Sequence, residues 1–175
     1  LKGLNRKTFE QTVMKTMRRR LADLGKFSVY DAQSTIYIEP KSDDIDIDEA
    51  FSRMQKVFGI ATLSRAAVCA KDFDEICRVA VEYMGADFQQ AHTFKVVAKR
   101  SDKTFSMDSM QLACELGAVL LEKFPHLTVD VKKPEYKVFV EVRDYAAYVH
   151  PDKVRGAGGM PTATSGKASV MLSGG

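Results

Sequence analysis

The sequence predicts an α+β protein built from two small domains, followed by a linker and the beginning of a third domain. Stretches with the period of a helix that buries one face alternate with stretches of period two, which is typical of α/β and α+β folds. A length of 175 residues suits one large or two small domains. Beyond Pro151 the chain becomes rich in Gly, Thr and Ser. We therefore place the four segments at 1–58, 59–150, 151–167 and 168–175.

The first segment reads as helix, strand, strand, helix. Asn5 can cap a helix that runs to about Leu24 with one apolar stripe. Two alternating runs within 27–39 flank a polar turn and predict a hairpin. Asp46 and Glu49 form a capping box for a second helix, which Gly59 is expected to end. This order is that of a ferredoxin-like unit whose first strand is missing.

The second segment begins with a strand-like run over 60–70 and a helix that a capping box starts at Asp72 and Gly85 ends. A strand from Phe94 and a helix that ends near Leu121 follow, joined by a turn rich in cations. The stripe that we expect this helix to bury consists of Met107, Met110, Cys114, Gly117 and Leu121.

Three further strand-like runs complete the second segment, and the composition then changes. The runs cover 127–131, 136–142 and 145–149, the last as an extension of the one before it. The Gly-rich stretch 151–167 reads as a flexible tether and lacks the spacing of a phosphate-binding P-loop. The apolar run from Ala168 reads as a buried strand again.

The net charge of +3 is distributed unevenly along the chain. Residues 1–30 carry eight cations and two anions, whereas residues 31–60 carry three cations and seven anions. A basic patch made by such segregation can bind nucleic acid, and a solvated helix face explains it equally well. A second group of cations lies at the strand that starts at Phe94, next to a helix start, where a phosphate backbone could bind. Its members are Lys95, Lys99, Arg100 and Lys103.

Other kinds of site receive little support. The three cysteines form no C-x-x-C pair, which suits a reducing cytoplasm, and we interpret them as buried, inert thiols. The three histidines lack metal-ligand spacing, and no carboxylate pair stands out. No apolar run approaches the length needed to span a bilayer. We expect no exposed aromatic row for base stacking, so single-strand reading is not the main mode.

Several stretches together resemble one family. The central one reads FKVVAKRSDKTF followed by DSMQLACELGAVLL and is similar to the signature of a THUMP domain, an RNA-binding module. The flanks read LKGLNRKTFE, GAGGMPTATSGK and VMLSGG, and with them the whole chain resembles the tRNA 4-thiouridine synthetases, or tRNA sulfurtransferases. The resemblance implies a ferredoxin-like domain that lacks its first strand, a THUMP domain, and the stub of a PP-loop domain. We therefore expect the chain to be part of a longer, cytoplasmic protein.

The resemblance also implies the chemistry of the whole protein. Such enzymes bind tRNA, activate a uridine with ATP and Mg²⁺, and transfer sulfur from a persulfide that a cysteine desulfurase supplies; some also serve thiamine synthesis. The resemblance names no catalytic residue in this chain, and a homodimer stays open. RNA contacts are expected from the four central cations together with Lys2, Arg6 and Lys7. ATP contacts are expected from the strand end and the first half of an SGG-x-D-S loop, namely Met171, Leu172, Ser173, Gly174 and Gly175.

Two alternatives remain at this point. The chain could be the RNA-binding region of another THUMP enzyme, such as a tRNA methyltransferase. It could also be an RNA-binding protein without enzymatic activity. In each case Lys and Arg on a shaped surface suit folded RNA, because A-form helices present phosphates and 2′-hydroxyls.

Overall fold

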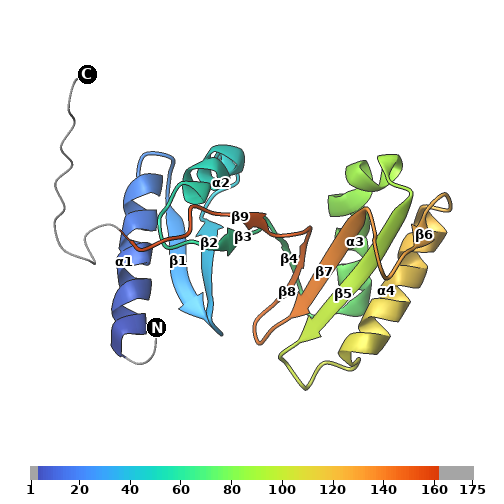
Figure 1. Cartoon of the computed structure of the whole chain (residues 1–175). Helices are drawn as coiled ribbons and strands as arrows, with labels where there is room; N and C mark the ends of the chain where they lie inside the picture. The colour runs from blue at the N-terminus through green and yellow to red at the C-terminus, as the bar shows by residue number, and fades with distance from the viewer. Residues whose placement is uncertain (1–3, 162–175) are drawn as a thin grey trace. The chain divides into compact units, whose positions relative to one another are not determined.

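The computed structural model describes residues 4–161 and divides the chain into two compact units (Figure 1). The first unit contains the chain up to Leu63 and again from Val154 onward, and the second contains Ser64–Lys153. Both units combine helices with strands, so the predicted α+β class is confirmed. Lys2 and the five expected ATP-contacting residues lie outside the described part of the chain.

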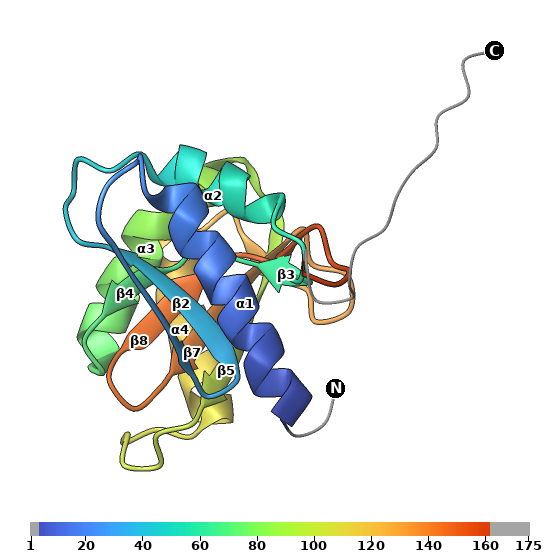
Figure 2. The same ribbon diagram turned by 90° about the vertical axis from the view of Figure 1, so that its left-hand side faces the viewer.

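The first unit packs two helices against a hairpin. Helix α1 covers Leu4–Leu21, strands β1 and β2 cover Phe27–Ala32 and Thr35–Pro40, and α2 covers Ile47–Gln55. Figure 2 shows α1 lying along the hairpin. The apolar stripe expected for α1 is buried together with residues of β1 and α2, and the core of the unit consists of Val13, Met14, Met17, Leu21, Val29, Ala50, Met54, Val57 and Ile60.

Two turns of the first unit depend on positive φ angles. Gln33 and Ser34 have φ of 48° and 62°, as the two central residues of a tight hairpin turn require. We expected Gly59 to end α2, but that helix already ends at Gln55. Gly59 instead has a φ of 99°, and a Cβ there would lie 2.6 Å from Cγ2 of Val13. This glycine therefore permits a turn that passes close to α1.

The strand predicted over 60–70 is two strands that belong to different units. Thr62–Leu63 is β3, which pairs antiparallel with β9, Val154–Arg155, in the first unit. Ala67–Cys69 is β4, which joins the sheet of the second unit. The ladder continues past β9, where the Gly156 amide donates to the carbonyl of Ala61 at 3.0 Å. This part of the predicted linker is therefore paired and is not a free tether.

The second unit is a five-stranded sheet with two helices. Its strands run in the order β4-β8-β7-β5-β6, where β5 is parallel to β6 and β7, and β8 is antiparallel to β7 and β4. The predicted extension over 145–149 is therefore wrong, because the chain reverses to form β8. Beyond β4 the elements are α3 Phe73–Gln90, β5 Thr93–Arg100, α4 Ser109–Lys123, β6 Thr128–Val129, β7 Tyr136–Val142 and β8 Ala147–His150.

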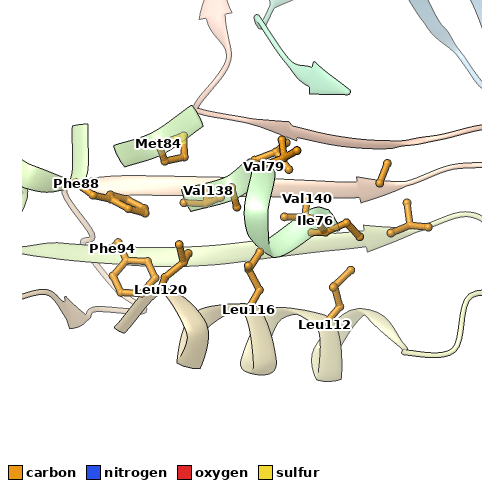
Figure 3. Close-up of a cluster of buried hydrophobic side chains, with 14 of the residues drawn as sticks. Ile76, Val79, Met84, Phe88, Phe94, Leu112, Leu116, Leu120, Val138 and Val140 are labelled. Carbon is orange, nitrogen blue, oxygen red and sulfur yellow. The ribbon is translucent and has the colours of Figure 1, made fainter. Parts of the chain in front are cut away.

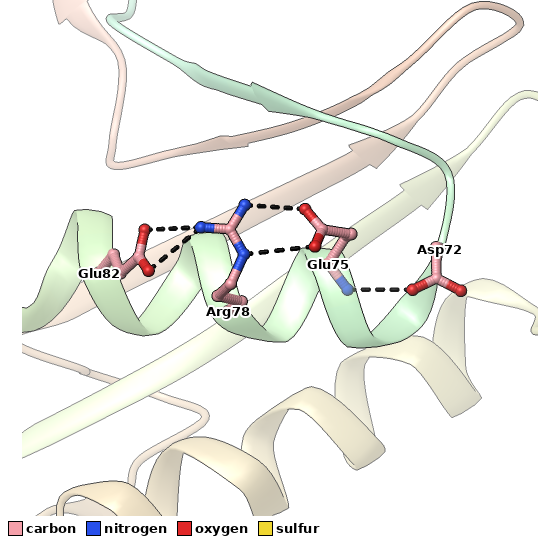
Figure 4. A network of polar contacts seen from close by, with 4 residues as sticks. All are labelled: Asp72, Glu75, Arg78 and Glu82. Atoms are coloured by element: carbon pink, nitrogen blue, oxygen red, sulfur yellow. Dashed lines mark hydrogen bonds and ion pairs between the residues drawn. The ribbon is translucent and has the colours of Figure 1, made fainter.

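Side-chain caps determine where both helices of the second unit begin. The carboxylate of Asp72 accepts from the amide of Glu75 at 3.1 Å, which confirms Asp72 as the N-cap, whereas the Glu75 carboxylate pairs with Arg78. Asp108 accepts from the amide of Gln111 at 2.8 Å in the same way at α4. On the exposed side of α3, an Arg lies between two Glu residues one turn before and after it (Figure 4).

Both helices cover the same face of the sheet. Ile76, Met84 and Phe88 of α3 meet Leu112, Leu116 and Leu120 of α4 and Val138 and Val140 of β7 in one cluster (Figure 3). The stripe expected for α4 was therefore wrong in part. Met110 is 78% exposed and Cys114 is exposed, whereas Gly117 does face β5. Because α4 is apolar around most of its circumference, its period alone does not select the buried side.

Candidate RNA-binding surface

The alternation of β5 separates the four central cations predicted as one site. Phe94 is fully buried under the helices, and Arg100 lies on that same side of the strand by parity. Lys95 and Lys99 point to the opposite face, which carries no helix of this unit. Their Cα atoms are about 13 Å apart along the strand. The structure therefore brings together only part of the predicted cluster.

A lysine that we did not predict joins them from the neighbouring strand. Lys137 of β7 is the register partner of Lys95, so the two lie side by side on the helix-free face. Their ammonium groups have other partners: Lys95 Nζ donates to the carbonyl of Val131 at 3.4 Å, and Lys137 Nζ lies 3.4 Å from Oδ2 of Asp152. Like charges directly opposite each other destabilise a sheet, and an anion relieves that cost. We call Lys95, Lys99 and Lys137 the cationic sheet face.

Arg100 and Lys103 occupy the connection between β5 and α4 in different roles. The Arg100 guanidinium donates to the carbonyl of Phe105 at 3.2 Å and so spans the base of the connection. Lys103 is exposed at its tip, in the segment Ser101–Phe105, which we call the cationic turn. Arg100 thus stabilises this turn through its hydrogen bond to Phe105, whereas Lys103 is accessible to a ligand.

An ion pair between distant residues anchors the cationic turn. Lys71, just before α3, donates to Oδ2 of Asp102 at 2.5 Å and to the carbonyl of Asp144 at 2.6 Å. Oδ1 of Asp102 accepts from the amide and the hydroxyl of Thr104 at 2.8 Å and 2.6 Å. The hydrogen bond from Lys71, followed by those from Thr104, lowers the pKa of Asp102 far below its usual range. The sequence did not reveal this pair, because its members lie 31 positions apart.

A buried charged group lies on the same face of the sheet as the lysines. Glu141 is 6% exposed, faces Lys99 across the ladder, and accepts from His150 and Arg143. The hydrogen bond from His150, followed by the contacts with Arg143, lowers the pKa of Glu141 to about 2 against the desolvation that opposes it. Phe139 stacks on the His150 ring with centroids 5.1 Å apart. Glu141 is thereby held as an anion inside the protein.

Two of the three contacts predicted for the first unit lie on α1, and the third, Lys2, lies outside the described residues. Arg6 and Lys7 are both exposed, and Nε of Arg6 pairs with Glu10 at 2.8 Å. The helix has no acidic residue in its first turn and three arginines in its last. One of these, Arg18, donates to the carbonyl of Val29 at 2.7 Å and so fastens the helix to the hairpin. The exposed face of α1 is therefore strongly basic.

Other features of the described residues give no further candidate site. A pocket of about 340 Å³ opens beside the cationic turn, but its single cation faces two carboxylates, which disfavours an anion; its lining consists of Lys71, Asp72, Phe73, Asp102, Thr104, Phe105 and Ser106. Burial raises the pKa of the Cys77 thiol to about 11, which makes it a poor nucleophile. The prediction that all three cysteines are buried is wrong for Cys114, which is exposed on α4. Within residues 4–161, no group of His, Cys, Asp and Glu side chains is arranged to hold a metal ion. No helix in that range is long and apolar enough to cross a membrane.

Two domain families match the sequence. Residues 1–64 match the ThiI ferredoxin-like domain, and residues 70–152 match the THUMP domain. The probable tRNA sulfurtransferase of Acetivibrio thermocellus is 39% identical over 100% of this chain and 45% of its own length. The probable tRNA sulfurtransferase of Macrococcus caseolyticus is 41% identical over 100% of this chain and 43% of its own length. The predicted order of the two domains is thus confirmed.

A solved structure agrees with these matches. The crystal structure of a 4-thiouridine synthetase–RNA complex with bound ATP superposes with a TM-score of 0.86 at 31% identity. The superposition covers 100% of this chain and 44% of that one. This chain therefore spans less than half the length of each of these three relatives.

Proposed function

This chain belongs to the ThiI-type tRNA sulfurtransferases as their ferredoxin-like and THUMP region, and from this we propose that it is the part of such an enzyme that binds tRNA. The observation that carries the proposal is the placement of lysines on the helix-free face of the second unit, within a domain of an RNA-binding family. Lys95, Lys99 and Lys137 lie on that face, and Lys103 is exposed in the turn that follows β5.

The arrangement suits folded RNA because the charges are fixed on a sheet. Strand β5 fixes Lys95 and Lys99 about 13 Å apart on one face, and Lys137 lies beside Lys95 on the neighbouring strand, so the three charges keep defined positions. A-form RNA presents phosphates and 2′-hydroxyls but no readable major groove, so such a surface recognises shape more than sequence. In the first unit, Arg6 and Lys7 on α1, together with Lys2, are proposed as further contacts with RNA.

The rest of the proposal concerns the whole enzyme. We expect it to activate a uridine of the bound tRNA with ATP and Mg²⁺ and to exchange the uridine oxygen for sulfur, which gives 4-thiouridine. The first half of its phosphate-binding loop is then Ser173, Gly174 and Gly175, and Met171 and Leu172 before it are expected to line the nucleotide. We expect a cysteine desulfurase to supply the sulfur, the cytoplasm to be the location, and sulfur for thiamine synthesis to be a second product. This chain by itself is expected to bind tRNA without modifying it.

A binding experiment tests the central claim. Fluorescence anisotropy measures the affinity of the 175-residue chain for an unmodified tRNA transcript between about 50 and 200 mM salt. We expect Lys99→Ala and Lys103→Ala each to weaken binding and to reduce the salt slope by about 0.9, because each removes one phosphate contact. Lys95→Ala and Lys137→Ala are expected to act in the same direction.

Lys123→Ala is the matched control. Lys123 is exposed in the last turn of α4, on the helix-covered side of the sheet, so its loss removes the same charge without removing a proposed contact. If this control lowered the affinity and the salt slope as much as Lys99→Ala does, binding would depend on net charge alone. The proposed surface would then be wrong.

A further inference from the structure

We propose that Lys71 and Asp102 are positioning residues that hold the cationic turn in the shape that binds RNA, without contacting RNA themselves. This inference rests on the proposed function and deepens it. The cationic turn is the segment Ser101–Phe105, and Lys103 at its tip is the side chain that the pair places.

The pair joins three loops at one end of the sheet. Lys71 belongs to the connection between β4 and α3, Asp102 to the connection between β5 and α4, and Asp144 to the connection between β7 and β8. The Lys71 ammonium group donates to residues of both other connections, at 2.5 Å to the Asp102 carboxylate and 2.6 Å to the Asp144 carbonyl. The amide of Ser101 also donates to the carbonyl of Val142 at 2.8 Å. The turn is thus fastened at its base, and Lys71 connects it to the rest of the sheet end.

Asp102 uses both of its carboxylate oxygens as acceptors. Oδ2 receives the Lys71 ammonium, and Oδ1 receives two hydrogen bonds from Thr104. The side chain of Asp102 is 11% exposed and that of Lys71 is 30% exposed. Lys71 is therefore neutralised by its partner and largely covered, which makes it a poor phosphate contact. The fixed turn next to the pair leaves Lys103 exposed.

The direction in which one substitution changes RNA affinity distinguishes a positioning role from a purely electrostatic one. Asp102→Asn removes a negative charge next to the proposed phosphate contacts, so charge counting predicts tighter binding of RNA. An amide has one acceptor oxygen where the carboxylate has two, so the asparagine side chain cannot hold Lys71 and Thr104 on separate oxygens as Asp102 does. If the pair positions the turn, the same substitution weakens binding of an unmodified tRNA transcript by about fivefold near 0.15 M salt and lowers the salt slope by about 0.9, because one phosphate contact is lost.

Two further variants keep the test independent of global folding and of net charge. Thr104→Ala changes no charge and is expected to weaken binding in the same direction as Asp102→Asn. Asp74→Asn makes the same change of charge in the first turn of α3, where Asp74 is exposed, and is expected to leave the affinity unchanged or slightly raised. Thermal unfolding of each variant verifies that the second unit stays folded at the temperature of the binding assay.

The outcomes are distinct. Weaker binding by Asp102→Asn and Thr104→Ala, with Asp74→Asn unaffected, supports the positioning role. Unchanged or tighter binding by Asp102→Asn overturns it while the RNA-binding surface stands, provided that Lys103→Ala still weakens binding. If Lys99→Ala and Lys103→Ala have no effect on affinity or salt slope, the proposed function itself fails, and this inference fails with it.

Discussion

At the scale of single residues, Glu141 shows how the sheet carries a charge in its interior. The carboxylate is 6% exposed, and burial alone would raise its pKa. His150 and Arg143 hydrogen-bond to it and overcome that effect, so that its pKa falls to about 2. A group bound this well contributes to stability only while it is ionised.

The stability of the second unit should therefore depend on pH within a defined acidic range. A carboxyl group with a lowered pKa stabilises the fold above its unfolded value, here 4.5, and loses that contribution as the pH falls through the folded value of about 2. We expect Glu141→Gln to destabilise the chain by about 1–3 kcal/mol at neutral pH. Urea unfolding of both proteins should show this difference shrinking as the pH falls from 4.5 toward 2.

Glu122→Gln serves as the control for that experiment. Glu122 is exposed on α4, so its substitution should change the free energy of unfolding little at any pH. A difference between the wild-type chain and Glu141→Gln that stays constant across the window would show that the ionised form of Glu141 is not what stabilises the sheet.

At the scale of elements, helix α3 continues past the residue expected to end it. Gly85 lies five residues before the last residue of the helix, at Gln90, and its φ is not in the left-handed region. A Cβ at this position would meet only the ring of Phe124, at 3.9 Å, which is an ordinary contact. The expectation failed because glycine is tolerated inside a helix that tertiary packing stabilises.

We therefore expect Gly85→Ala to stabilise the second unit by about 0.5–1 kcal/mol, since alanine has the higher helix propensity and loses less backbone freedom on folding. Thermal unfolding measures the gain as a rise in Tm. Gly59→Ala is the contrasting variant, because its positive φ and the 2.6 Å approach to Val13 make a side chain costly there. A loss of stability in Gly85→Ala would mean that the Phe124 ring cannot accommodate the added methyl group.

Local signals predicted some elements well and others poorly. The caps at Asp46 and Asp72 and the strand over 136–142 depend on neighbours within a few residues, and all three are confirmed. The alternation expected for that strand does not appear in its burial, because Glu141 is buried between Val140 and Val142. The two-residue period of β5 also implies that the side chains of Lys99 and Arg100 point to opposite faces of the sheet. The prediction of one cluster is wrong because it relied on proximity in sequence alone. The register that places Lys137 beside Lys95, and the pair of Lys71 with Asp102, arise only when distant segments meet.

At the scale of the whole molecule, the first unit is discontinuous in sequence. The strand pair β3–β9 brings the chain at Val154 back to Thr62–Leu63, and the second unit lies between them in the sequence. Gly156 follows β9 where the backbones approach closely, because a Cβ there would lie 2.4 Å from the carbonyl oxygen of Ile60. Only a residue without a side chain fits at this point.

Gly156→Ala should consequently weaken the first unit and leave the second intact. We expect a loss of about 1–3 kcal/mol, because the backbone of Ile60 or of the return segment must shift. Hydrogen exchange measures the effect: protection of the amides of Gly156 and Gly158, which donate to Ala61 and Ile60, should fall. The amides of β5 and β7 should exchange as before. Equal loss of protection in both units would contradict this separation.

The return of β9 has a consequence for how the polypeptide forms on the ribosome. The second unit is continuous, so all of its sheet has been synthesised once Lys153 has left the exit tunnel. The helices and hairpin of the first unit emerge earlier, yet their closing strand emerges after every other helix and strand of the described chain. Of the two units, the amino-terminal one is thus completed later, and any nascent chain or proteolytic fragment that stops before Val154 lacks its closing strand.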